Sequence, residues 1–166
     1  MIIIKNVLSK EERIQLIEDS KPLLIAGEEL SLRFKKYFSV SKQTLSNLHK
    51  NDKFKPIIRK LLDRIAIEMG PGLEPVTDNV WVNWNSGKKE EMMWHSHSAY
   101  DYACVYYMQT IPFLNSGTQF VEEFIRAPQN SLMIFPGYEM HSVPSYPFGF
   151  ERYTLSMDLN IVRCMG

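Results

Sequence analysis

The chain has 166 residues, of which 45% are hydrophobic and 23% are charged, and 19 lysines and arginines balance 19 aspartates and glutamates. This length allows about one domain with a sizeable core, and this composition excludes a disordered chain. With a net charge of zero, the chain has no excess of positive charge to bind the phosphates of a nucleic acid, so we expect no nucleic-acid partner.

The first part of the chain predicts a short strand followed by helices. Residues 2–8 have the pattern of a strand, and Ser9 with Glu12 three positions later fits a capping box. The helix that this box begins covers residues 10–21. A second helix, over residues 52–69, carries a single apolar stripe. We expect both helices to form a packing layer over a sheet.

Short strands dominate the chain from residue 76 onward, separated by turns rich in glycine, proline and asparagine. They are predicted at residues 76–85, 102–108, 119–124, 131–135 and 152–161. Many short strands at this spacing favour a sandwich or a barrel, and their position after the helices favours an α+β chain that is mainly β. We therefore treat residues 1–166 as a single domain, with a strand and helical layer over 1–75 and a β core over 76–166.

The sequence also limits where the protein works. No run approaches the roughly 18 apolar residues of a membrane span. The apolar start of the chain lacks the basic segment of a signal peptide, so we expect a cytoplasmic protein with no membrane partner. Cys104 and Cys164 form no short metal motif; free thiols are expected, while a disulfide between them stays open. The sequence does not indicate an oligomeric state.

Three of the four histidines have the spacing of metal ligands. Residues i and i+2 of a strand point to the same face, so His95 and His97 can share one ion, and imidazole suits iron, zinc, copper and nickel. His141, after an apolar strand and a turn, is the best candidate for a third ligand. His49 lies in a polar stretch and is expected at the surface. The alternative without a metal is a polar strand pair beside a buried His141.

The histidines stand within a larger set of motifs in the second half of the chain. These are Trp81-Val82-Asn83, Trp94-His95-Ser96-His97, Val105-Tyr106-Tyr107, Leu132-Met133-Ile134-Phe135-Pro136, His141 and Glu151-Arg152-Tyr153-Thr154-Leu155-Ser156. Together they resemble the 2-oxoglutarate- and Fe(II)-dependent oxygenases of the prolyl-hydroxylase-like branch, over about residues 76–162. The resemblance implies a cupin-like double-stranded β-helix, or jelly-roll barrel, with the N-terminal helices packed outside.

The resemblance also implies roles for particular residues. The family motif is His-x-Asp/Glu, then a distal histidine and, shortly afterwards, a basic residue. His95 and His141 match the two histidines, and Arg152 follows 11 positions after His141. In the family this basic residue pairs with the distal carboxylate of 2-oxoglutarate, which a planar guanidinium can bind through two parallel hydrogen bonds. Further candidate contacts to the co-substrate are Thr154, Tyr106 and Asn83.

The chain departs from the family motif at its third position, where His97 replaces the carboxylate. We predict that His97 is the third ligand of a three-histidine iron site. The alternative is that a nearby carboxylate, such as Asp101, is the third ligand instead. The predicted function is a dioxygenase, a hydroxylase that uses Fe(II) and 2-oxoglutarate on a small-molecule or peptide substrate, with no catalytic residue beyond the metal ligands. The alternatives are a three-histidine oxygenase that does not use 2-oxoglutarate and a non-catalytic jelly-roll binding protein.

Overall fold

The computed structural model describes residues 1–35, 42–85, 92–111, 116–143 and 151–163. The helices are α1 (Lys10–Ser20), α2 (Gly27–Phe34) and α3 (Lys55–Met69), with short 3-10 turns η1 (Lys21–Leu23) and η2 (Leu48–Lys50). The larger sheet contains β1 (Ile2–Lys5), β2 (Ile25–Ala26), β3 (Lys42–Gln43), β4 (Leu73–Asn85), β6 (Tyr102–Gln109), β9 (Ser131–Pro136) and β11 (Arg152–Arg163). The smaller sheet contains β5 (Met92–His95), β7 (Gly117–Phe120), β8 (Phe124–Arg126) and β10 (His141–Val143).

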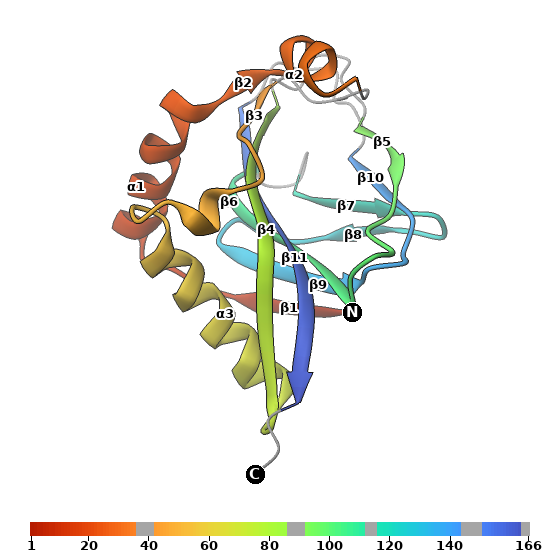
Figure 1. The fold of residues 1–166 in the computed structure, drawn as a ribbon. Coiled ribbons are helices and arrows are strands. Elements are labelled where there is room, and N and C mark those ends of the chain that lie inside the picture. The colour runs from red at the N-terminus through yellow and green to blue at the C-terminus, as the bar shows by residue number, and fades with distance from the viewer. Residues whose placement is uncertain (36–41, 86–91, 112–115, 144–150, 164–166) are drawn as a thin grey trace.

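The two sheets form the opposite walls of a barrel; α1 and α3 lie outside the larger sheet, and α2 lies at one end of the barrel (Figure 1). The larger sheet has the strand order β1-β9-β6-β11-β4-β3-β2, and the smaller has β5-β10-β7-β8. The pairs that join these strands are antiparallel. This is the predicted double-stranded β-helix with helices packed outside.

Local sequence signals account for the helical layer. Ser9 Oγ accepts the backbone N–H of Glu12 at 3.1 Å, and the Glu12 carboxylate accepts the backbone N–H of Ser9 at 2.8 Å. This reciprocal pair is the predicted capping box, and it satisfies N–H groups that the first turn of α1 leaves open. Both long helices then turn an apolar face to the sheet, burying Leu16 and Ile17 of α1 and Ile58, Leu61 and Ile65 of α3.

The core has two layers, because side chains along a strand alternate between the faces of the sheet. On β6, Tyr106 packs in the layer between the larger sheet and the helices, whereas Tyr107 packs in the layer between the two sheets. Side chains alternate in the same way along β11. Those that face the helices are apolar: Tyr153, Leu155, Met157 and Leu159. The intervening polar side chains face the interior of the barrel, and they are Arg152, Thr154, Ser156 and Asp158.

Several elements differ from the sequence-based expectation. The first strand ends at Lys5 rather than at residue 8. The strand expected at 119–124 is instead a hairpin of β7 and β8, because the chain turns between Phe120 and Phe124 and the Phe120 N–H bonds to the carbonyl of Glu123 at 2.8 Å. The sequence did not predict α2, β2, β3 or β10. In the described residues, no helix combines the length and the apolar character that crossing a membrane requires.

Candidate metal centre and adjoining pocket

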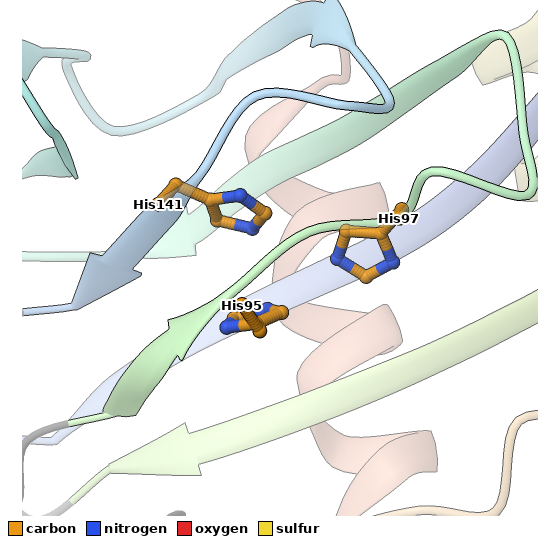
Figure 2. A group of neighbouring side chains, drawn as sticks. All are labelled: His95, His97 and His141. Atoms are coloured by element: carbon orange, nitrogen blue, oxygen red, sulfur yellow. The ribbon is translucent and has the colours of Figure 1, made fainter.

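Three imidazoles lie close together where β5 and β10 of the smaller sheet pair (Figure 2). His95 ends β5 and His141 begins β10, and the two are direct partners across these strands. His97 comes from the segment just after β5, so the strand expected to carry both members of the His-x-His pair ends at the first. One ring nitrogen of each histidine lies within 4.8 Å of those of the other two. Metal–imidazole bonds are about 2.1 Å long, so the rings would have to move closer together for all three to bind one ion.

The second nitrogen of each ring faces an oxygen atom. Nδ1 of His95 lies 2.8 Å from the Met93 carbonyl, and Nδ1 of His141 lies 2.9 Å from the Glu139 carbonyl. A carbonyl only accepts hydrogen bonds, so both Nδ1 atoms carry the proton and both Nε2 atoms keep a lone pair. Nδ1 of His97 lies 2.7 Å from a carboxylate oxygen of Asp158. Histidines that bind metals in proteins are held by hydrogen bonds such as those of His95 and His141, so the donor set fits a divalent transition-metal ion.

Burial keeps the innermost ligand neutral. His141 is only 4% exposed. Desolvation, with smaller contributions from the neighbouring His95 and His97, lowers the pKa of His141 to about 3. The imidazole is therefore uncharged at neutral pH, which is the form that binds a metal.

A glycine positions the segment that carries His97. The backbone N–H of His97 donates to the carbonyl of Gly137 at 2.7 Å, and the N–H of Gly137 donates to the carbonyl of Asp101 at 3.0 Å. A Cβ atom at Gly137 would lie 2.2 Å from the Tyr100 carbonyl oxygen and 2.6 Å from that of His97. Any side chain here would push the two segments apart. Gly137, which follows β9, therefore holds a metal-ligand candidate in place.

The histidines open on a cavity of about 590 Å³ that also contains the polar row of β11. Arg152 lies in this cavity and is 2% exposed. Its Nη2 donates to the carbonyl of Gly117 at 3.1 Å, and its guanidinium carbon lies 5.5 Å from the centre of the Tyr107 ring. Thr154 lines the same cavity. A buried cation with a hydroxyl two residues away is suited to an anionic ligand.

Asn83 is the third predicted pocket residue that the structure brings to this cavity. It is 3% exposed, and its Nδ2 donates to Ser156 Oγ at 3.2 Å. Its Oδ1 meets no donor within the described part of the chain. A buried polar atom without a hydrogen bond is costly, so this amide is suited to a ligand or a bound water.

The prediction for Tyr106 is wrong, because the sequence did not show which of two adjacent tyrosines faces the barrel. Tyr106 lies in the helix-side layer, and its hydroxyl donates to Asn130 Oδ1 at 2.7 Å. Burial raises the pKa of Tyr106, so the hydroxyl stays protonated as a donor. Asp101 is also excluded as the missing carboxylate ligand. It is exposed, and its Oδ2 accepts the backbone N–H of Ile161 at 2.8 Å.

Sequence reasoning missed three residues of the site. Tyr107 places its ring beside Arg152, and its hydroxyl lies 2.5 Å from Thr118 Oγ1, which lines the cavity. Asp158 also lines this cavity and lies beside His97. Asp158 could have been found, because it lies six positions after Arg152 on a strand with a period of two. His49, expected at the surface, is partly buried and lies outside the histidine cluster.

No family model matches the chain, and no curated protein matches it in sequence. Solved structures do match its fold. A Pseudomonas putida prolyl-4-hydroxylase has a TM-score of 0.65 at 14% identity, over 99% of this chain and 92% of that one. The chain has the fold of the 2-oxoglutarate- and Fe(II)-dependent oxygenases. The predicted fold is thus confirmed, and prolyl hydroxylases are among the solved structures that share it.

Two further structures extend the comparison. A Trichoplax adhaerens prolyl hydroxylase, in complex with a peptide of the hypoxia inducible factor oxygen degradation domain, has a TM-score of 0.63 at 13% identity. HygX from Streptomyces hygroscopicus, with nickel, 2-oxoglutarate and hygromycin B bound, has a TM-score of 0.69 at 9% identity. Each match covers 96% of this chain and 82% of the other. At such low identities the similarity concerns the fold.

Proposed function

We propose that this protein is a 2-oxoglutarate- and Fe(II)-dependent dioxygenase that hydroxylates its substrate. One observation carries the proposal: three clustered imidazoles, two of them with Nδ1 hydrogen-bonded to a backbone carbonyl, line the same cavity as a buried arginine. A metal site alone would not require the arginine, and an anion site alone would not require the histidines. The fold supports the same conclusion.

The three histidines hold the metal in this proposal. His95, His97 and His141 would supply three imidazole nitrogens to the metal, and a set of three protein ligands would leave coordination sites for the co-substrate and oxygen. The chemistry supplied at such a centre is the activation of dioxygen, coupled to oxidative decarboxylation of 2-oxoglutarate to succinate and carbon dioxide. The protein's part is to keep His141 neutral, to orient the imidazoles and to exclude water from the cavity.

The polar row of β11 and its neighbour on β4 hold the co-substrate. Arg152 pairs with the distal carboxylate of 2-oxoglutarate through parallel N–H donors, and Thr154 adds a hydroxyl. Asn83 assists from the adjacent strand. The Ser156 hydroxyl can donate as well as accept, so the Asn83 amide can turn over and present Nδ2 as a donor to the carboxylate.

The proposed substrate is a small molecule or a peptide. The similar structures solved with a peptide and with hygromycin B support this range. We further infer that residues 1–166 act as a single domain in the cytoplasm.

A second candidate is a three-histidine oxygenase that does not use 2-oxoglutarate. The observation in its favour is that the clustered ligand candidates are all imidazoles, with no carboxylate among them in the described residues. The two candidates share the metal centre and differ in the role of Arg152.

The deciding experiment measures 2-oxoglutarate binding by calorimetry under anaerobic conditions, with iron-loaded wild type, Arg152→Lys and Arg152→Met. We expect the wild type to bind and Arg152→Met to lose at least about 30-fold in affinity, because truncating one member of a buried charge pair costs about 2 kcal/mol or more. Arg152→Lys keeps the positive charge but loses the two parallel N–H donors of the guanidinium, so its affinity for 2-oxoglutarate should lie between those of the wild type and Arg152→Met. All three should bind iron alike.

Turnover supplies the second measurement: wild-type protein with iron, oxygen and 2-oxoglutarate should release succinate. Wild-type protein that binds iron but neither binds nor consumes 2-oxoglutarate would support the second candidate instead.

A further inference from the structure

One buried carboxylate in the cavity has no place in the ligand set described above. Asp158 is 2% exposed and lies on the face of β11 that carries Arg152 and Thr154. Its Oδ1 lies 2.7 Å from Nδ1 of His97, within the range of an ion pair, and no donor among the described residues makes a hydrogen bond to it. A buried carboxylate is costly unless it is paired, so His97 is the group that justifies its position.

A second contact fixes the direction of this carboxylate. Oδ2 of Asp158 accepts from Nδ2 of Asn79 at 2.5 Å, and the two residues are direct partners on β11 and β4. Asn79 is held in turn, because its backbone N–H and carbonyl both contact Thr77 Oγ1. The Trp81 ring stacks on the imidazole of His97, with 5.8 Å between centroids and 29° between planes. The ring therefore has neighbours at its face and at its Nδ1 edge.

The three histidines differ in what stands behind them. The Nδ1 atoms of His95 and His141 face neutral carbonyl oxygens, whereas that of His97 faces a carboxylate. Three neutral imidazoles bring no charge to a divalent ion. A carboxylate behind one of them adds a negative charge near the ion and makes that imidazole a more basic ligand.

We propose that Asp158 is the positioning residue of the metal centre: it orients His97 with Nε2 toward the ion and supplies, from behind that ring, the negative charge that the three-histidine ligand set lacks. Asn79 keeps the carboxylate aimed at His97. This inference rests on the proposed metal site and does not depend on the use of 2-oxoglutarate.

The test uses the full chain and the metal alone. Ni(II) affinity is measured by calorimetry for wild type and Asp158→Asn, without 2-oxoglutarate. We expect a loss of about 10- to 100-fold in Asp158→Asn, the usual effect of removing such a partner. The matched control is Asp101→Asn, which neutralises an aspartate whose carboxylate, among the described residues, accepts only the backbone N–H of Ile161. This control should bind nickel like the wild type.

A second readout separates an electrostatic role from a merely structural one. Less negative charge at the centre disfavours Fe(III) relative to Fe(II), so the reduction potential of the iron-loaded protein should be higher in Asp158→Asn than in the wild type. Asp158→Glu, which keeps the charge, should restore the potential toward the wild-type value. If Asp158→Asn does not fold, Asn79→Ala replaces it, with an expected severalfold loss of nickel affinity.

The outcomes are distinct. Equal nickel affinity and equal potential in wild type and Asp158→Asn would overturn the role of Asp158 and leave the proposed dioxygenase intact. Unchanged nickel affinity in Asn79→Ala, where that variant is the one measured, would likewise count against it. Wild-type protein that binds nickel but not 2-oxoglutarate would refute the proposed function and leave this inference standing. Wild-type protein that binds no metal would overturn both.

Discussion

Acid should destabilise the metal-free protein through His141 in particular. The pKa of this residue is about 3 in the folded chain because the ring is buried, and about 6.5 when the chain unfolds. Between these values the unfolded chain binds a proton that the folded chain does not. Stability is therefore unaffected by His141 above about pH 6.5 and falls as the pH decreases toward 3, by about 1.4 kcal/mol for each pH unit. At pH 5 the loss amounts to about 2 kcal/mol.

The measurement compares wild type with His141→Gln by urea unfolding at pH 7 and pH 5, in the presence of a chelator. Glutamine cannot take up the proton, so the wild type should lose about 2 kcal/mol more than the variant between the two pH values. Comparing pH differences, rather than absolute stabilities, removes any cost of the substitution itself. Equal losses in the two proteins would refute the reasoning, because they would mean that His141 accepts a proton in the folded state as readily as in the unfolded one.

Three further predictions concern single contacts. Ser9→Ala should lower the free energy of unfolding by about 1 kcal/mol through loss of the helix cap, and Ser9→Asp should largely preserve it; urea titration measures both. Tyr106→Phe should cost about 1 kcal/mol of stability and leave 2-oxoglutarate affinity unchanged. Weaker 2-oxoglutarate binding in calorimetry would instead indicate that the Tyr106 hydroxyl contacts the co-substrate. Gly137→Ala should weaken nickel binding by displacing the segment that carries His97, and an unaltered affinity would contradict the close backbone approach there.

The extent to which the sequence predicts this fold depends on the range of the signals. The capping box is local and is formed as expected. The longer strands of the barrel follow from period-two alternation, and their bounds are close to those predicted. In contrast, β2 and β3 have only two residues each and are defined by their pairing with distant strands, so no local pattern marks them. The hairpin of β7 and β8 was missed because its turn contains no glycine or proline.

The candidate site shows the same limit. The His-x-His pair and His141 were found from spacing and resemblance, since metal-ligand types are rare and recognisable. The choice between Tyr106 and Tyr107 failed because alternation gives the period of a strand but not its phase. The phase depends on which side the helices cover, and this is a property of the assembled fold. The partner of His97 was missed for a related reason, because nothing adjacent in the chain connects it with Asp158.

The last strand has a consequence for how this protein can change over evolution. From Arg152 to Asp158, β11 pairs continuously with β4, and a strand advances about 3.3 Å per residue, so these side chains stand about 20 Å apart on one straight support. Gaining or losing one residue between them would turn every later side chain to the opposite face. The carboxylate would enter the apolar layer beneath the helices, while a leucine or methionine would enter the cavity. Viable relatives should therefore keep the length of this stretch constant and place their insertions outside it.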